Sequence, residues 1–484
     1  MCSISGCLVL HNCEKVQSSK VIKTIRQIMI NGEDRGRDSF GIITFGYTGK
    51  IREKIKLPSR ISEYFKTNDL TKSFKVLINN NRAEPCCEHI KNKTIEDVQP
   101  FTSAKQRFYI AHNGTIANDK DLEAKYNLTR NTKIDSAIIP PLLDALWDGK
   151  DTTQLIKILQ DELIGSYALV IYDVKNPKQI WLATNYKPLF IMKEHGALFF
   201  SSLENYLVNK DYNNIYNIRS KIMEVKPYTL LKINEHKIES FDLYKTKTGK
   251  KKALVICSAG LDSTVCAKWA QVQGYDISLL HYHYGARANN AEDRQIKLIA
   301  KNLNCELVEI NTDIFKNVIK HSRLTNPEDE GGLVKTNDGE ASAELAWEWV
   351  PARNLIFMSI AAGYAEANKF DYIILGGNNE ESSSYSDNEL IFQKKFNELL
   401  PNALNLQNKV EVLVPVANLM KREIVKLGLD IKAPLHLTWS CYEDGDVHCG
   451  MCGPCLMRRV GFKMNKIKDM IPYKDLPKDF WEDM

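Results

Sequence analysis

Short runs that alternate apolar and polar residues dominate the chain up to about residue 240. Such alternation is typical of strands that bury one face. Helical spacing of apolar residues interrupts these runs around 18–30 and 135–162. The pattern predicts an α+β domain built from layers of mostly antiparallel sheet. The expected strands are SISGCLVL (3–10), SFGIITFG (39–46), FKVLINN (74–80), RFYIAHNG (107–114), SYALVIYD (166–173), QIWLATN (179–185), LFIMK (189–193), ALFFSS (197–202) and YTLLKIN (228–234).

The pattern changes after a polar, basic stretch, YKTKTGKK at 244–251, which is typical of a linker. Beyond it, buried-type strands alternate with helices, and this alternation predicts an α/β domain with a doubly wound parallel sheet. We therefore expect two domains, 1–245 and 250–484. A loop rich in glycine and acidic residues, 327–344, interrupts the second. Its expected strands and helices are 252–258, 261–274, 276–285, 291–304, 305–311 and 371–377.

Composition narrows the class of protein. A net charge of +5 over 484 residues permits a nucleic-acid partner without arguing for one. The chain has no run of about 18 apolar residues, so no membrane partner is expected. It also shows no secretory signal, which predicts a cytoplasmic protein. Twelve cysteines in such a protein favour metal binding or catalysis over disulfides.

A cysteine follows the initial methionine, and removal of Met1 would make Cys2 the N-terminal residue. An N-terminal cysteine carries its own base, because an α-amino group with a pKa near 7.7–8.0 keeps a large neutral fraction at physiological pH. A small buried hydrophobe is the ordinary alternative for a free cysteine. Five other stretches decide between the two: DRGRDSFGI (34–42), NNRAEP (80–85), AHNGTIAN (111–118), KIDSA (133–137) and GSYAL (165–169).

Together with Cys2, these stretches resemble the class II glutamine amidotransferases in order and spacing over residues 2–240. The resemblance implies an N-terminal nucleophile hydrolase fold and glutamine as substrate. Cys2 matches the nucleophile, Arg82 the guanidinium that binds the glutamine carboxylate, and Asp135 the carboxylate that binds its ammonium group. Asn113 and Gly114 match the oxyanion donors. The alternatives are a surface arginine, a helix N-cap at Asp135 and a hairpin turn at HNG.

A second constellation is VICSAGLDST at 255–264, where a strand ends, small residues follow and a helix begins. Backbone N–H groups and the helix dipole make such a loop an anion site. Ser258, Gly260 and Ser263 are expected to hold the phosphates of ATP, and Asp262 is suited to help hold Mg²⁺. A generic serine-glycine turn is the alternative.

The loop resembles the SGGxDS loop of ATP pyrophosphatases, which cleave ATP to AMP and pyrophosphate. Ala259 stands where that family has glycine, and a negative φ would let alanine replace it. Many enzymes share the loop, but the segments downstream are more specific. They closely resemble 7-cyano-7-deazaguanine synthase over 250–465 in HYHYGAR (281–287), VPARN (350–354), ILGGNNEESSSYSD (374–387), NLMKREIVKLGL (418–429) and LTWSCY (437–442).

This second resemblance assigns further residues. Arg353 and Lys421 are the cations expected on the phosphates, because adenylyl transfer spreads negative charge that fixed cations neutralise. The alternatives are a structural salt bridge for Arg353 and a solvated lysine at a helix start for Lys421. Tyr385 and Asp387 match a segment that faces the deazaguanine, where Asp387 is suited to accept from the N–H edge of the base.

Four cysteines follow the pattern C-x7-C-x2-C-x2-C: Cys441, Cys449, Cys452 and Cys455. Four thiolates at this spacing suit a closed structural Zn²⁺ site, and an iron–sulfur cluster is the competitor. The synthase family carries a zinc site with this pattern. His448 is surplus as a ligand and is expected at the surface. Cysteines 7, 13, 257, 266 and 305 are expected in the core, and cysteines 86 and 87 have no assigned role.

The whole chain resembles a family that fuses a class II amidotransferase to a QueC-like domain and is associated with archaeosine-type deazaguanines. The resemblance implies glutamine- and ATP-dependent transfer of ammonia to the C7 substituent of a 7-deazaguanine. The product, whether amide, nitrile or amidine, stays open, as does a homo-oligomer. The alternatives are an asparagine synthetase-like enzyme and a non-catalytic nucleic-acid adaptor.

The acceptor base is free or lies in tRNA or DNA, and a nucleic-acid acceptor is slightly favoured. Such an acceptor needs cations for its phosphates. The candidates are Arg287, Arg458, Arg459, Lys463, Lys466 and Lys468.

Overall fold

The computed structural model divides the chain into two compact units, residues 1–245 and 246–484. Among the residues that the structure describes, no helix is both long and apolar enough to cross a membrane. The described residues are 2–10, 19–70, 73–83, 94–208, 220–245, 249–317, 319, 322, 324–325, 349–379, 385–405, 409–477 and 480–482.

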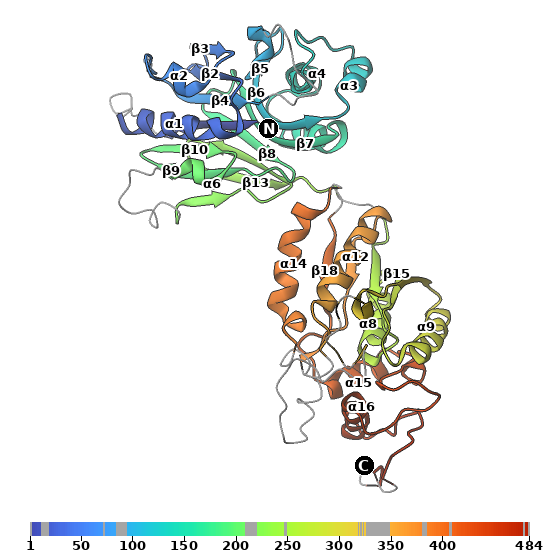
Figure 1. Cartoon of the computed structure of the whole chain (residues 1–484). Coiled ribbons are helices and arrows are strands. Elements are labelled where there is room, and N and C mark those ends of the chain that lie inside the picture. Colours follow the sequence, from blue (N-terminus) through green and yellow to red (C-terminus); the bar gives the residue numbers. More distant parts are fainter. Residues whose placement is uncertain are drawn as a thin grey trace. The chain divides into compact units, whose positions relative to one another are not determined.

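Two antiparallel sheets form the centre of the first unit (Figure 1). The sequence did not predict four of their strands, at 51–57, 101–102, 222–224 and 238–242. The seven-stranded sheet has the order β11 (Ile222–Glu224), β9 (Phe190–Glu194), β10 (Ala197–Ser201), β1 (Ser3–Val9), β4 (Val76–Arg82), β2 (Ser39–Phe45), β3 (Ile51–Leu57). The six-stranded sheet has the order β13 (Ile238–Asp242), β12 (Thr229–Asn234), β8 (Gln179–Thr184), β7 (Gly165–Asp173), β6 (Phe108–Ile116), β5 (Phe101–Thr102).

The first unit has four layers, two sheets between two layers of helices. Each sheet is apolar on both faces, because successive side chains along a strand point to opposite faces. Ile4 and Leu8 of β1 pack in the cluster between the sheets, whereas Cys7 and Val9 face the cluster under α1. Further helices cover the six-stranded sheet around Leu142. This layering confirms the expected α+β class. The helical segments are α1 (Ser19–Asn31), η1 (Gly32–Arg35), α2 (Ile61–Tyr64), η3 (Ile95–Asp97), α3 (Asp119–Tyr126), η4 (Asp135–Ile138), α4 (Ile139–Leu146), α5 (Thr152–Lys157), η5 (Ile158–Glu162) and α6 (Glu204–Leu207).

A five-stranded parallel sheet forms the centre of the second unit. Its first three strands in the chain run outward from the middle to one edge, and the last two continue from the middle to the other. The change of direction between the strands at Lys252–Ile256 and Tyr372–Ile374 is a topological switch point, where ligands of such folds bind beyond the carboxyl ends of the strands. The order is β16 (Glu306–Asn311), β15 (Asp276–His283), β14 (Lys252–Ile256), β17 (Tyr372–Ile374), β18 (Glu411–Leu413).

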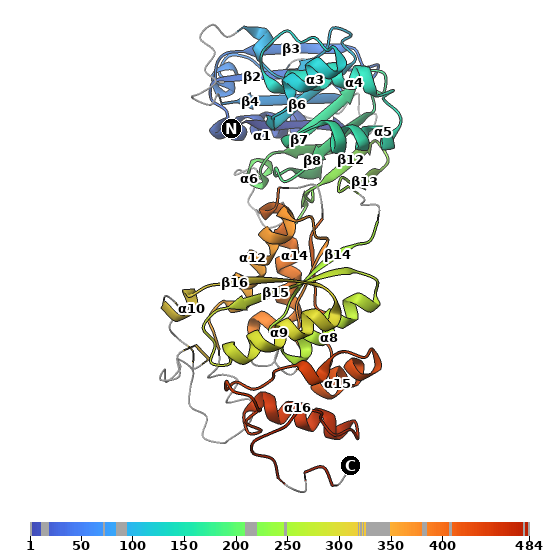
Figure 2. The ribbon, with the colours of Figure 1, turned by 90° about the vertical axis from the view of Figure 1, so that its right-hand side faces the viewer.

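Helices cover both faces of this sheet, as the apolar run of β14 requires. Ala253 and Val255 face the cluster with α8 and α9, and Leu254 faces the cluster with α12 and α14. Figure 1 shows these pairs on opposite sides of the sheet, and Figure 2 shows α15 beside α16. The expected α/β class is confirmed. The helices are α8 (Leu261–Val272), α9 (Asn289–Leu303), α10 (Ile314–Asn317), α12 (Arg353–Ala367), η6 (Ser386–Asn388), α14 (Leu390–Ala403), α15 (Lys421–Asp430), η7 (Leu435–Leu437) and α16 (Gly453–Met464).

Candidate functional site

The first cluster of polar residues gathers where β1 begins and β4 ends. Ser3 of β1 pairs with Asn81 of β4, so Cys2 lies beside Arg82 at the end of β4. Burial raises the pKa of the Cys2 thiol, while the Arg82 guanidinium and a backbone hydrogen bond from Ala83 act to lower it. The half-buried thiol is therefore held next to a fixed positive charge.

Arg82 is 5 % exposed, so the surface-arginine alternative is wrong. Within the described part of the chain, its Nε has no hydrogen-bond partner and its guanidinium makes no ion pair. A buried cation without a counter-charge is costly unless a ligand supplies one. The site is therefore suited to an anion such as a carboxylate.

Asp135 begins η4, but its carboxylate does not cap that helix. Its Oδ2 accepts a hydrogen bond of 2.6 Å from the backbone N–H of Ile116. Ser136 Oγ lies 3.1 Å from Asp135 Oδ1 and 2.6 Å from His112 Nδ1. The N-cap alternative is therefore wrong. His112 belongs to the quoted AHNGTIAN stretch but had no expected role, and it is buried behind the carboxylate, where burial lowers the pKa of its ring.

Asn113 and Gly114 lie inside strand β6, so the hairpin-turn alternative is wrong. Asn113 is buried, and its Nδ2 has no hydrogen-bond partner among the described residues. Gly114 has φ +152°, and a Cβ there would lie 1.9 Å from the carbonyl oxygen of Ser166. The sequence therefore needs glycine at this position, and a free amide donor lies beside it.

The second cluster forms where β14 ends and α8 begins, at the switch point of the parallel sheet. Gly260 N–H donates to Ser258 Oγ at 3.3 Å, and Ser263 Oγ donates to Gly260 carbonyl oxygen at 3.2 Å. Gly376, just after β17, lies so close that a Cβ would be 2.8 Å from the backbone nitrogen of Ser263. The loop is thus held from within and from the neighbouring strand, and α8 directs its N-terminal dipole at the same space.

Ala259 has φ +63°, in the left-handed region. The condition under which alanine was expected to replace glycine, a negative φ, is therefore not met. Its carbonyl oxygen accepts a 2.9 Å hydrogen bond from Trp439 N–H, and the residue is fully buried. Tertiary contacts therefore impose a conformation that costs alanine about 1–2 kcal/mol.

Asp262 and Lys421 are ion-paired, with Lys421 Nζ 2.6 Å from Asp262 Oδ2. Asn378 Nδ2 donates to the same oxygen at 2.7 Å. The other oxygen, Oδ1, is buried with no partner among the described residues. Lys421 is 8 % exposed, so the solvated-lysine alternative is wrong. An orphaned carboxylate oxygen at a phosphate loop fits a hard cation such as Mg²⁺.

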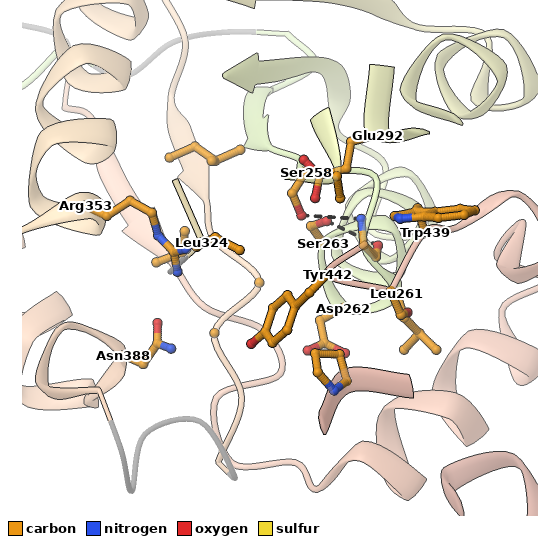
Figure 3. Close-up of a pocket in the computed structure, with 18 of the residues that line it drawn as sticks. Ser258, Leu261, Asp262, Ser263, Glu292, Leu324, Arg353, Asn388, Trp439 and Tyr442 are labelled. Atoms are coloured by element: carbon orange, nitrogen blue, oxygen red, sulfur yellow. Dashed lines mark hydrogen bonds between the residues drawn. The ribbon is translucent and has the colours of Figure 1, made fainter. Parts of the chain in front are cut away.

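A cavity of about 240 Å³ opens beside this loop (Figure 3). Figure 3 shows Ser258 and Asp262 on one side of it and Arg353 and Asn388 on the other. The structure brings together most residues that the sequence proposed for this unit. Those that line the cavity are Ser258, Gly260, Asp262, Ser263, Arg353, Tyr385 and Lys421.

Arg353 begins α12 and faces the far side of the cavity. It makes no ion pair among the described residues and lies 3.5 Å from Tyr284 Oη. Burial alone lowers its pKa, but Tyr284, Tyr385 and Asp387 act the other way and raise the pKa above that of an ordinary arginine. Asp387 lies close behind, with Oδ2 accepting from Asn354 N–H at 3.2 Å. The guanidinium stays charged and is available to a ligand.

Glu292 of α9 also lines the cavity, and the sequence interpretation did not single it out. Burial raises the pKa of its carboxyl to about 8, against a lowering influence from Arg353. Its Oε2 is buried without a hydrogen-bond partner among the described residues. The only sequence signal was its place in the first turn of a helix that follows HYHYGAR.

The four cysteines converge as their spacing predicts. Their sulfurs all lie within 4.8 Å of one another, with Cys452 Sγ 3.9 Å from Cys441 Sγ. Zn–S bonds of about 2.3 Å would place tetrahedral sulfurs roughly 3.8 Å apart. Backbone N–H groups of Glu443 and Cys449 point at Cys441 Sγ from 3.4 and 3.3 Å, and the pKa of Cys441 is strongly lowered, first by its neighbour Cys452. The donor set fits a tetrahedral metal ion.

Two expectations near this cluster are wrong. His448 is 2 % exposed rather than at the surface, and its Nε2 accepts a 2.9 Å hydrogen bond from Ser440 N–H. Arg458 is 1 % exposed and forms two hydrogen bonds with the carboxylate of Asp469. Arg458 is therefore not a surface cation for nucleic acid.

The expected core cysteines divide in a similar way. Cys7, Cys257 and Cys266 are buried as expected, and Cys305 is half-buried. Cysteines 13, 86 and 87, the end of the NNRAEP stretch at 84–85, residues 380–384 and the loop 327–344 lie outside the described residues.

Comparison with known proteins decides the family. A protein of Sulfurisphaera tokodaii named 7-cyano-7-deazaguanine synthase 2 is 46 % identical over 482 residues, which is 98 % of this chain and 100 % of that one. The chain belongs to the 7-cyano-7-deazaguanine synthase family. A synthase of Sulfolobus acidocaldarius is 44 % identical over 98 % of this chain and its own full length. This membership makes the chain an enzyme.

Two family models match the synthase-family chain in separate regions. Residues 252–466 match the queuosine biosynthesis protein QueC, and residues 87–209 match a glutamine amidotransferase domain. A solved glutamine phosphoribosylpyrophosphate amidotransferase from B. subtilis covers 94 % of this chain and 96 % of its own, at 15 % identity. Its TM-score is 0.37, too low to indicate a shared overall structure.

Proposed function

We propose that the chain hydrolyses glutamine in its first unit and uses the ammonia, with ATP, to build the C7 nitrile of a free 7-deazaguanine in its second. The observation that carries the proposal is the cavity at the switch point, where an anion-binding loop faces the Arg353 guanidinium. Membership of a family named for this product supports it. The amidotransferase match supports glutamine as the nitrogen source.

In the first unit, Cys2 is the proposed nucleophile, which forms a glutamyl thioester and releases ammonia. Arg82 binds the glutamine carboxylate, and its buried guanidinium, which makes no ion pair among the described residues, supports that role. Asp135 binds the ammonium group. Asn113 Nδ2 and the N–H of Gly114 stabilise the oxyanion. The oxyanion thereby supplies a partner for the buried Asn113 amide, whose Nδ2 has none among the described residues.

In the second unit, Ser258, Gly260 and Ser263 are the proposed phosphate ligands at the start of α8. Asp262 holds Mg²⁺ through Oδ1, the oxygen without a hydrogen-bond partner in the described part of the chain. Lys421 already neutralises its other oxygen at 2.6 Å and lies within reach of the phosphates. ATP with Mg²⁺ is therefore the proposed cosubstrate of this site.

The base lies on the other side of the cavity in this proposal. Tyr385 offers its ring to the planar base, and Asp387 accepts from the N–H edge. Arg353 neutralises charge that develops on the acyl phosphate. Asp387 Oδ2 already accepts from Asn354 N–H, so this hydrogen bond fixes the carboxylate for the base.

The proposed reaction has two ATP-dependent stages. A C7 carboxylate attacks the α-phosphorus of ATP and displaces pyrophosphate, and ammonia then displaces AMP to give the amide. The amide oxygen is adenylylated in the same way by a second ATP. Loss of AMP and two protons from that intermediate gives the nitrile.

A free base is proposed as acceptor because two of the cations that the sequence suggested for nucleic-acid binding form ion pairs within the protein. Arg458 is buried in its pair with Asp469, and Arg287 lies 3.1 Å from Glu443. Family membership also stands against an asparagine synthetase-like enzyme and against a non-catalytic adaptor. The four cysteines are proposed to hold structural Zn²⁺.

The proposal for the first unit is tested with Cys2→Ala. Glutamine-dependent product should disappear, while product formed from added ammonium salts should remain, because only the first unit needs the thiol. Mass analysis of the purified wild type should show that Met1 is removed. Undiminished use of glutamine by Cys2→Ala would refute the assignment of the nucleophile.

Asp262→Asn tests the ATP site. AMP and pyrophosphate formation should fall by at least tenfold with glutaminase activity of the first unit retained, because the variant loses the negative charge that is proposed to hold Mg²⁺. Asp446→Asn is the matched control, since that side chain is 98 % exposed. Formation of ADP and phosphate by the wild type would contradict the proposed chemistry.

Cys449→Ser tests the zinc assignment. The variant should lose one zinc per chain and unfold its second unit more easily, because structural zinc contributes folding free energy. A wild type without metal, whose four cysteines react readily with an alkylating agent in the native state, would contradict it.

The acceptor is tested by binding and turnover together. The free 7-carboxy-7-deazaguanine should be converted efficiently, with tRNA and duplex DNA neither bound nor modified. Lys466 and Lys468 are exposed, so their double reversal to glutamate should leave turnover unchanged. A nucleic-acid acceptor would be favoured if the protein modified tRNA and bound it with a steep salt dependence, and if the double reversal abolished this binding.

A further inference from the structure

Two histidines and an aspartate converge behind the anion-binding loop, outside the cavity described above. His281 and His283 are two residues apart on β15, so their side chains share the face that α9 covers. Asp293 of α9 places Oδ1 3.2 Å from His281 Nε2 and 2.7 Å from His283 Nδ1. The three ligand atoms all lie within 4.8 Å of one another.

The remaining nitrogen of each ring has its own partner. His281 Nδ1 lies 2.8 Å from the carbonyl oxygen of Cys257, and His283 Nε2 lies 3.2 Å from Glu309 Oε1. A carbonyl oxygen only accepts, so His281 Nδ1 must carry a proton. Metal-binding histidines have this arrangement, because the hydrogen bond on one nitrogen fixes the lone pair of the other.

This protonation leaves a conflict at the centre of the cluster. In neutral His281 the lone pair of Nε2 faces the lone pairs of Asp293 Oδ1 at 3.2 Å, which is repulsive. A second proton would remove the repulsion, but His281 is 1 % exposed, and a buried imidazolium has to be desolvated. A cation between the two atoms also removes it and leaves both histidines neutral.

We propose that His281 Nε2, His283 Nδ1 and Asp293 hold a divalent transition-metal ion, with zinc as the best match. Two imidazoles and one carboxylate are ligands that zinc prefers, and three protein ligands leave a fourth position open to water. Bonds of about 2.0–2.1 Å place tetrahedral ligand atoms roughly 3.3 Å apart, close to the 3.2 Å between His281 and Asp293. The 2.7 Å separation from His283 then opens slightly when the ion binds.

The ion has a positioning role. It joins β15 to α9, and through His281 it fixes the carbonyl of Cys257, the residue directly before the Ser258 loop. It is separate from the four-cysteine cluster and does not depend on the proposed reaction. Its presence is therefore testable in the absence of any substrate.

Asp293→Asn separates a metal site from a hydrogen-bond network. The amide of asparagine can donate to His281 Nε2, so a network without metal would keep its geometry and its stability. A metal site would lose its only anionic ligand. Purified wild type, Asp293→Asn and the exposed control Asp446→Asn are incubated with excess zinc, separated from free metal by gel filtration and analysed for metal content.

We expect wild type and Asp446→Asn to carry one more zinc per chain than Asp293→Asn, whatever the occupancy of the cysteine cluster. The same comparison should show a lower melting temperature for Asp293→Asn. Should that variant fail to fold, anomalous scattering at the zinc edge from wild-type crystals decides. A peak between the three side chains would support the site. Equal metal content in all three proteins, or no such peak, would overturn it.

Discussion

Replacing Arg458 by methionine should destabilise the second unit strongly, although the sequence places this residue in a run of basic residues typical of a surface. Both charged side chains of the pair with Asp469 are buried, at 1 % and 0 % exposure. The guanidinium donates to the carboxylate at 2.7 and 3.2 Å and to the Leu435 carbonyl at 2.9 Å. Removing it leaves a buried carboxylate whose remaining strong partner is the Tyr473 hydroxyl at 2.6 Å.

The cost follows from that uncompensated charge. Breaking a buried pair by removing one partner costs about 3–5 kcal/mol, or roughly two to four orders of magnitude in the opening equilibrium. Arg459→Met is the matched control, because Arg459 makes no ion pair among the described residues and stacks 4.8 Å from the Phe480 ring. That change should cost about 1 kcal/mol.

Native-state hydrogen exchange of peptides from α16 measures the free energy of opening for each variant, and it reports on the second unit within the full chain. The double variant Arg458→Met with Asp469→Asn should recover part of the loss, because it removes the orphaned charge and keeps an acceptor for the Tyr473 hydroxyl. If the amides of α16 exchange as slowly in Arg458→Met as in Arg459→Met, the buried pair has no stabilising role and the reasoning is refuted.

Three further changes probe the two sites. Ala259→Gly should stabilise the second unit by up to about 1 kcal/mol, since glycine adopts φ +63° without strain and the larger entropy of its unfolded chain offsets part of the gain; equal or lower stability in thermal unfolding would contradict this. Gly114→Ala should abolish glutamine-dependent activity and spare ammonia-dependent activity; Gly196→Ala, also at positive φ but in open space, should spare both, and equal effects would contradict a specific clash. Because folding raises the pKa of Glu292 to about 8, its contribution to stability is greatest below the unfolded pKa near 4.5 and is lost as pH rises through 8. Glu292→Gln should therefore match the wild type at pH 4 and melt at a progressively higher temperature than the wild type as pH rises, by more than about 5 °C at pH 9; parallel melting curves across that range would count against the shift.

The sequence pattern of apolar and polar residues predicted the strands and helices that bury one or both faces. The alternation of Ile4 and Leu8 with Cys7 and Val9 separates two cores, and the continuous apolar run of β14 marks a central parallel strand. Strand β3, with the sequence IREKIKL, escaped prediction because it is an edge strand with exposed charges. Short edge strands such as β18 carry too few residues for any pattern.

Site residues were predictable where the chemistry demands a residue type at a fixed place in a motif, as for the four cysteines. Burial was not predictable for long polar side chains. Nothing in MRRVGFKMNKIK distinguishes Arg458 from its basic neighbours, because its partner Asp469 comes eleven residues later in an irregular segment. Likewise, His448 and Glu292 are buried by contacts with elements remote in sequence, and their neutral states depend on that burial.

The central claim is that one chain joins glutamine nitrogen to a 7-deazaguanine at the expense of ATP. It is tested most directly by incubating the wild type with amide-¹⁵N glutamine, ATP, Mg²⁺ and 7-carboxy-7-deazaguanine, and then analysing the base and the nucleotides by mass spectrometry. We expect the nitrile with one ¹⁵N atom and two AMP per product, with no labelled product from Cys2→Ala. An unchanged base, or a labelled product formed with ADP and phosphate, would contradict the claim.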